Sequence, residues 1–162
     1  MKKISKVLSL MLVGLCLIGA VGCSKTKDGE DMISKSSDTA AVGYKDGEYK
    51  ASADNYDDQG YKPTVKIVVD NGVLYSVDCD AESKNEGTKK ADSESGQYNM
   101  KQGGSQYEWH EEIAFFEKHV VKNGVESIRL DDSGKTDAIS GCTIAVKEYV
   151  DLIKEALNKA KE

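Results

Sequence analysis

The sequence has little proline, arginine or uninterrupted hydrophobicity. Its 162 residues include one proline, and the fifteen glycines follow no repeating pattern, which excludes a collagen-like chain. A single long hydrophobic run, at the N-terminus, excludes a polytopic membrane protein. Acidic residues outnumber Lys and Arg by 28 to 22, giving a net charge of −6, whereas nucleic-acid binding needs clustered cations. We therefore exclude nucleic acid as a partner and expect one domain with an added tail.

Histidine is also scarce, and neither of its two copies belongs to a catalytic or metal-binding motif. His110 and His119 are nine residues apart, which places them on opposite faces of a predicted helix. Ala114 occupies the position where the HExxH zinc motif has its second histidine. The acidic residues at 57–80 and 131–132 lack the spacing of an EF-hand calcium loop. We therefore predict no metal site and no catalytic residues, and we expect both histidines at the surface.

The N-terminal segment has the composition of a signal peptide. Three lysines precede an uncharged run of 16 residues at 7–22, shorter than the roughly 20 residues that span a membrane. The run ends in small residues directly before Cys23. This pattern resembles the bacterial lipobox, in which signal peptidase cuts before the cysteine and its sulfur carries diacylglycerol. Ala20 occupies a lipobox position that is more often leucine.

Cys23 is therefore the predicted site of lipid attachment on a bacterial lipoprotein. Residues 1–22 form the predicted signal peptide, residues 23–42 a polar flexible tether, and residues 43–162 the folded domain. The mature protein then has 19 basic and 28 acidic residues, a net charge of −9. We expect it at the extracytoplasmic face of the bacterial cell membrane. The alternatives are an ordinary secretory signal with an incidental cysteine, and an uncleaved anchor.

The first half of the folded part has the alternating pattern of β-strands. Strands are predicted at 46–51, 64–69 and 73–80. The last two are joined by Asn71-Gly72, a dipeptide typical of two-residue hairpin turns. The polar residues 81–106 show no hydrophobic period and are predicted to form a long loop.

The second half has the apolar spacing of helices. Residues 107–123 carry one apolar stripe and stop at Gly124, and residues 144–161 carry a second stripe. A short strand is predicted at 125–130, followed by a turn at 131–134. The expected class is therefore α+β, a small antiparallel β-sheet with packed helices in a single domain.

Two cysteines, Cys79 and Cys142, remain in the predicted domain. An exported compartment permits a disulfide between them, and two free buried thiols are equally simple. The distance that a bridge requires cannot be obtained from sequence. We expect no disulfide.

A compact motif precedes the second predicted helix, with Thr143 at or beside its N-cap. It consists of Asp137, Ser140, Gly141, Cys142 and Thr143 in the order Asp-x-x-Ser-Gly-Cys-Thr. Helix capping would explain the threonine, with a contribution of about 1 kcal/mol, but not the whole motif. The motif resembles the Asp-x-x-Ser/Thr-Gly-Ala-Thr flavinylation motif of the FMN-binding domain family, with Cys142 in place of alanine. In that family the final threonine carries FMN through a phosphoester bond.

The resemblance extends over most of the predicted domain, about residues 43–161. It includes Asp-Gly-x-Tyr-x-Ala at 46–51, Gly-Tyr-Lys-x-x-Val at 60–65, the Asn-Gly hairpin and Glu-Ala-Leu-x-x-Ala at 155–160. The family occurs in the C and G subunits of sodium-pumping and Rnf-type electron-transport complexes, and in extracellular lipoproteins that pass electrons outward. The lipoproteins are the closer likeness, because these segments resemble theirs. The Glu-Thr-Pro-Gly segment of the complex subunits is missing, which leaves the residues over the flavin ring unassigned.

The resemblance implies an FMN site at the motif, and the chemistry of its residues agrees. Free N–H groups at a helix N-terminus donate hydrogen bonds to phosphate oxygens, and Gly141 allows the backbone to approach the phosphate closely. Ser140 can donate to phosphate oxygens, and Cys142 is small enough for the alanine position. We expect Asp137 to serve recognition by the flavin transferase or metal-assisted transfer.

The function implied by the resemblance is that of a membrane-anchored extracytoplasmic flavoprotein. It would carry FMN covalently on Thr143 and relay electrons, as a carrier rather than a stand-alone enzyme. The implied partners are a flavin transferase, a membrane redox donor (quinone-linked or a dehydrogenase) and an extracellular acceptor. The alternative is a flavin-free surface lipoprotein that binds a small ligand or a protein partner. A third possibility is that the cleaved signal peptide is itself released as a peptide signal, as in some relatives.

Overall fold

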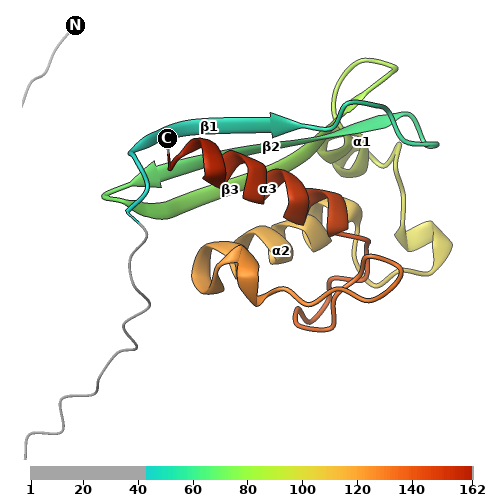
Figure 1. Ribbon diagram of the computed structural model, residues 1–162. Helices are drawn as coiled ribbons and strands as arrows, with labels where there is room; N and C mark the ends of the chain where they lie inside the picture. The colour runs from blue at the N-terminus through green and yellow to red at the C-terminus, as the bar shows by residue number, and fades with distance from the viewer. Residues whose placement is uncertain (1–42, 162) are drawn as a thin grey trace, which may run out of the picture. The chain divides into compact units, whose positions relative to one another are not determined.

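The computed structural model describes residues 43–161, so the predictions for the signal peptide, Cys23 and the tether lie outside the described residues. Three antiparallel strands form one sheet in the order β1-β2-β3 (Figure 1). They are β1 (Gly47–Ser52), β2 (Tyr61–Asp70) and β3 (Val73–Ser83). All three predicted strands are present, and β2 is four residues and β3 three residues longer than expected.

The β2–β3 hairpin closes through the predicted Asn71-Gly72 turn. Asn71 has φ +52° and Gly72 has φ +75°, so both turn residues are left-handed. This is the conformation of a type I′ turn, whose twist matches that of the flanking strands and favours the sequence Asn-Gly. The register pairs Asp70 with Val73 and shifts between Val68 and Val69.

Three α-helices complete the domain, which confirms the α+β class. They are α1 (Lys89–Ser95), α2 (Trp109–Asn123) and α3 (Lys147–Lys159). Helix α3 packs against β1 and β2, and α2 packs against β3 (Figure 1). Two single turns of 3₁₀-helix, η1 (Lys101–Gly103) and η2 (Val125–Ser127), lie before and after α2.

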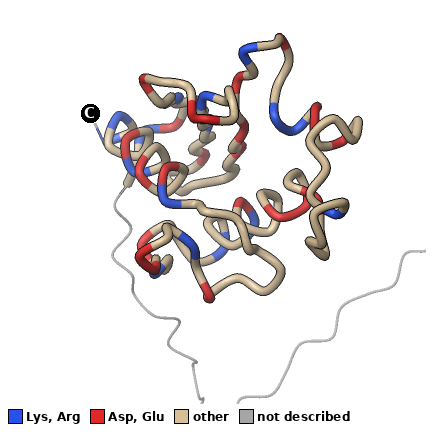
Figure 2. The backbone as a smooth tube through the Cα atoms, turned by 90° about the vertical axis from the view of Figure 1, so that its right-hand side faces the viewer, with Lys and Arg blue, Asp and Glu red and all other residues tan. Residues whose placement is uncertain are grey.

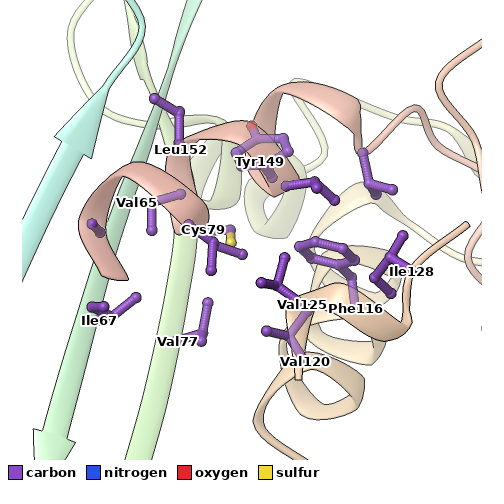
Figure 3. Packing of buried hydrophobic residues seen from close by; sticks show 14 of the residues in the cluster. Val65, Ile67, Val77, Cys79, Phe116, Val120, Val125, Ile128, Tyr149 and Leu152 are labelled. Carbon is purple, nitrogen blue, oxygen red and sulfur yellow. The ribbon is translucent and has the colours of Figure 1, made fainter. Parts of the chain in front are cut away.

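The core lies between the sheet and helices α2 and α3, and it uses the predicted apolar stripes. Side chains from β2, β3 and both helices converge there (Figure 3). Ile67, Ile113, Phe116 and Ile153 are fully buried. Burying a side chain of this size stabilises a fold by about 1.5–3 kcal/mol, so these stripes hold the layers together.

Charged residues of both signs are interspersed along the described backbone (Figure 2). One group of them joins three elements: Nζ of Lys90 on α1 lies 2.6 Å from Asp78 Oδ1 on β3 and 2.8 Å from Glu117 Oε1 on α2. Glu117 also accepts from the backbone N–H of Cys79 at 2.7 Å. This network holds the short helix α1 against the sheet.

The predicted long loop at 81–106 is wrong at three places. Strand β3 continues to Ser83, residues 89–95 form helix α1, and residues 101–103 form η1. The Thr88 hydroxyl caps α1 by accepting from the N–H of Ala91. The buried residues of α1 are Lys89 and Ser93, which are polar and have polar or aromatic partners. A helix that buries a lysine and a serine shows no hydrophobic period, which is why the pattern missed it.

The predicted strand at 125–130 is also wrong, because residues 125–127 form η2. Val125 and Ile128 are the buried residues of this segment. Their spacing of three is helical rather than alternating. The hydroxyl of Ser127 donates to the Gly124 carbonyl at 2.7 Å and the N–H of Ile128 donates to the Val125 carbonyl at 3.2 Å, which stabilise the tight turn.

Both cysteines of the domain are free and buried, as expected. Burial raises the pKa of the Cys79 thiol well above its usual value. Burial, followed by the nearby Glu112 carboxylate, raises the pKa of the Cys142 thiol to about 11. Both thiols are therefore protonated and unreactive at neutral pH.

Candidate functional site

A cleft of about 1080 Å³ lies where several segments of the chain meet. Its walls come from residues 57–63, residues 98–106, the first turn of α2 and residues 143–151, and Lys89 and Lys135 also line it. Ligand pockets usually have volumes of roughly 300–1,000 Å³, so the cleft can hold a molecule of cofactor size. The lining includes aromatic, cationic and acidic side chains: Tyr98, Trp109 and Tyr149, then Lys89, Lys135 and Lys147, then Asp57, Glu148 and Asp151.

Thr143 lies on the wall of this cleft, and its hydroxyl is held by a carboxylate. Thr143 Oγ1 lies 3.0 Å from both Oε1 and Oε2 of Glu112. The backbone N–H groups of Thr143 and Ile144 also donate to Glu112 Oε2. Ser105 Oγ, another residue of the cleft wall, donates to Glu112 Oε1 at 3.1 Å. Four donors therefore converge on one carboxylate.

The sequence motifs did not single out Glu112, although its position in the predicted helix indicates a special role. It lies in the first turn of α2 and is 0% exposed. Its position is three residues after Trp109 and one before Ile113, which places it within the apolar stripe rather than on the solvent face. A carboxylate on a buried helix face needs hydrogen-bond donors from elsewhere in the fold. A glutamate within the apolar stripe of a predicted helix therefore indicates a buried polar site.

The predicted start of the last helix is wrong, and so is the capping role of Thr143. Helix α3 begins at Lys147 with Val146 as its N-cap, so Thr143 lies three residues before the cap. The N–H of Thr143 donates to Glu112, and those of Val146 and Lys147 donate to the Gly134 carbonyl. These hydrogen bonds to other segments replace local helical hydrogen bonds, so the helix begins three residues later than predicted. The first turn of α3 still lines the cleft.

Other groups lie close to the backbone of Gly141, as expected, but these groups are aromatic rings. Its φ is +84°, and a Cβ there would lie 3.0 Å from Phe115 Cε2 and 3.1 Å from Tyr107 Cε2. The two rings are themselves packed edge to face, with centroids 5.1 Å apart. Glycine is therefore required by both the backbone conformation and the contact with these rings.

The remaining motif residues do not line the cleft. Asp137 and Ser140 are exposed, whereas Cys142 is buried at 4% exposure. The burial of Cys142 explains why the motif needs a small residue there. The structure thus brings Thr143 to the cleft and leaves Asp137 accessible from outside.

Lys89 contributes an unusual buried cation to the cleft wall. Only 8% of Lys89 is exposed. Its Nζ lies 4.4, 4.7 and 5.4 Å from the ring centroids of Tyr98, Tyr61 and Trp109 and donates to Gln59 Oε1 at 3.2 Å. Cation–π attraction offsets part of the cost of burial. Burial nevertheless lowers the pKa of Lys89 from its ordinary value.

Both histidines bond to serines rather than to a potential metal site. His110 Nδ1 lies 2.9 Å from Ser93 Oγ, and His119 Nε2 lies 3.2 Å from Ser127 Oγ. Within residues 43–161, no cluster of three or more His, Cys, Asp or Glu side chains could hold a metal ion. No helix in the same range is long and apolar enough to cross a membrane.

Comparison with known proteins places the chain in a family. The solution NMR structure of a protein from Clostridium thermocellum is similar with a TM-score of 0.56 and 43% sequence identity, over 73% of this chain and 93% of that one. The crystal structure of a protein from Clostridium perfringens is similar with a TM-score of 0.57 and 25% identity, over 73% of this chain and 89% of that one. A search of curated proteins gave no match. The sequence pattern of the FMN-binding domain matches residues 60–158. The chain therefore belongs to the FMN-binding domain family.

Proposed function

We propose that the protein carries FMN covalently on Thr143 and relays electrons at the extracytoplasmic face of a bacterial membrane. The observation that supports this proposal most is the Thr143 hydroxyl, which lies on the cleft wall and within hydrogen-bond distance of a buried carboxylate. A hydroxyl paired with an acceptor at this distance is the usual arrangement of an activated nucleophile.

The residues of the cleft suit the two ends of FMN. Aromatic side chains, among them Tyr98, Trp109 and Tyr149, offer flat apolar surface for an isoalloxazine ring. Lys135 and the first turn of α3 line the cleft together with Thr143 and offer positive charge for a phosphate, whereas the nearby Lys147 is ion-paired with Asp151 at 2.6 Å. When bound, FMN supplies one- and two-electron transfer, and the protein's own contribution is to hold and orient it.

A covalent attachment is physically useful outside the cytoplasm. A flavin that dissociates there is diluted into the surroundings, whereas a phosphoester keeps one flavin per protein whatever the affinity of the cleft. Maturation then requires a flavin transferase. The exposed Asp137, outside the cleft and six residues before Thr143, is available for recognition by that enzyme.

The location is proposed from the N-terminal sequence, and the redox partners are proposed from the resemblance to the extracellular lipoproteins of the family. A lipid on Cys23 would anchor the protein, and residues 24–42 would let the flavin domain reach both a membrane donor (quinone-linked or a dehydrogenase) and an extracellular acceptor. In this arrangement the protein is a carrier between two other redox centres.

The proposal is tested by expressing the protein together with a flavin transferase and measuring its intact mass. Wild type is expected to gain the mass of FMN less one water and to remain fluorescent in a denaturing gel. Thr143→Ala is expected to show neither change, and Thr143→Ser to retain partial attachment. Thr64→Ala, on β2, is the matched control and should behave as wild type. If wild type gains no mass with an active transferase, the flavin-free lipoprotein becomes the better account.

A further inference from the structure

We propose that Glu112 is a catalytic residue of flavin attachment, accepting the proton of the Thr143 hydroxyl as that oxygen attacks an activated flavin phosphate. This inference rests on the proposed attachment of FMN at Thr143. It assigns the removal of the proton to the acceptor protein itself, so that the flavin transferase only has to deliver and orient the donor nucleotide.

The geometry meets the requirement for proton transfer. A general base must lie about 2.6–3.2 Å from the atom that loses the proton, and both carboxylate oxygens of Glu112 lie 3.0 Å from Thr143 Oγ1. The N–H groups of Thr143 and Ile144 donate to Oε2, which fixes the backbone that carries the hydroxyl. The hydroxyl and its acceptor are thus oriented before any donor binds.

The negative charge of Glu112 is balanced by hydrogen-bond donors rather than by a cation. It is fully buried on α2, and within residues 43–161 no lysine, arginine or histidine forms an ion pair with it. Its charge is compensated by N–H and O–H groups alone, one of them from Ser105 on the cleft wall.

The chemical step balances with a donor of one class, a flavin nucleotide joined through a pyrophosphate to a second nucleotide. A bond forms between Thr143 Oγ1 and the flavin phosphorus. The bond from that phosphorus to the bridging oxygen breaks, and a nucleoside monophosphate leaves with the electron pair. The hydroxyl proton passes to Glu112, which becomes neutral. A neutral carboxyl then faces the new phosphodiester, so two negative charges are not held side by side.

The test measures initial rates of flavin incorporation by intact mass, using purified flavin-free protein, purified transferase and the dinucleotide donor. Glu112→Gln keeps the size of the side chain and an acceptor oxygen for the backbone donors, but it cannot take up the proton. We expect kcat to fall at least 100-fold, since a general base typically contributes about 10²–10⁴-fold, with KM for the acceptor protein changed less than twofold. The matched control is Glu117→Gln, on the same helix, which removes the charge that pairs with Lys90 and leaves the contacts of Thr143 untouched.

Glu112→Asp keeps the proposal testable if Glu112→Gln does not fold. Its carboxylate is one methylene further from Thr143, so we expect kcat to fall at least tenfold while the circular dichroism spectrum and the affinity for free FMN stay unchanged. Incorporation within threefold of wild type in either folded variant would overturn the role of Glu112 and leave the attachment at Thr143 intact. Absence of incorporation in wild type would overturn both.

Discussion

Substituting Gly141 by alanine should destabilise the domain through two effects that can be separated. The left-handed backbone at φ +84° costs an L-residue about 1–2 kcal/mol. The new Cβ would also lie 3.0 Å from Phe115 Cε2 and 3.1 Å from Tyr107 Cε2, and such overpacking costs about 1–3 kcal/mol. We therefore expect Gly141→Ala to lower the free energy of unfolding by about 2–5 kcal/mol.

Gly96→Ala supplies the matched control. Gly96 has a similar φ of +81°, but a Cβ built there meets no atom within 4 Å. It should therefore lose only the conformational contribution, about 1–2 kcal/mol. The difference between the two variants measures the contact between residue 141 and the rings.

The assay is urea unfolding followed by circular dichroism on residues 43–162, with Phe115→Leu as the third arm of a double-mutant cycle. Removing the Phe115 ring should recover much of the extra loss in Gly141→Ala, because the closest contact is gone. Equal losses in Gly141→Ala and Gly96→Ala, or no coupling between residues 141 and 115, would refute the assignment of Gly141 to ring packing.

Four further predictions follow from the described contacts and the N-terminal motif. Thr143→Ala removes one of four donors to Glu112 and should cost about 1 kcal/mol of stability, measured by urea unfolding. Burial lowers the pKa of Lys89, so between that lowered pKa and 10.5 the unfolded chain binds more protons than the native protein. The stability of wild type should therefore rise with pH in this range relative to that of Lys89→Met. Melting curves with the same pH dependence in both proteins would contradict this. Cys79 and Cys142 should react with an aromatic disulfide reagent at pH 8 only after denaturation, and rapid reaction of the native protein would show that the thiols are accessible. Cys23→Ala should be released from membranes or left unprocessed in fractionation, and processing and retention like wild type would rule out the lipid anchor.

The elements that could be predicted are those set by residues close together in the chain. The Asn71-Gly72 turn requires only the local preference of two residues for left-handed backbone. The apolar spacing of α2 and the alternation in β2 report which face each element buries, whatever it packs against. The family motif at residues 137–143 is also local, so it indicates Thr143 without knowledge of the fold.

The features that could not be predicted depend on partners far away in the chain. Helix α1 buries Lys89 against three rings and Ser93 against His110, so its pattern is not hydrophobic. The start of α3 is set by the carbonyl of Gly134 and the carboxylate of Glu112 rather than by its own capping residue.

The site itself shows the same division. The sequence alone predicted Thr143 as the residue that carries a flavin, because its motif is contiguous. Only the tertiary structure places Glu112, 31 positions earlier, against that hydroxyl and Phe115 against Gly141. Hydrogen bonds and ring contacts of this kind depend on the packing of α2 against the loop before α3. That packing follows from burying the apolar stripes of both helices on one sheet, which no local pattern of residues specifies.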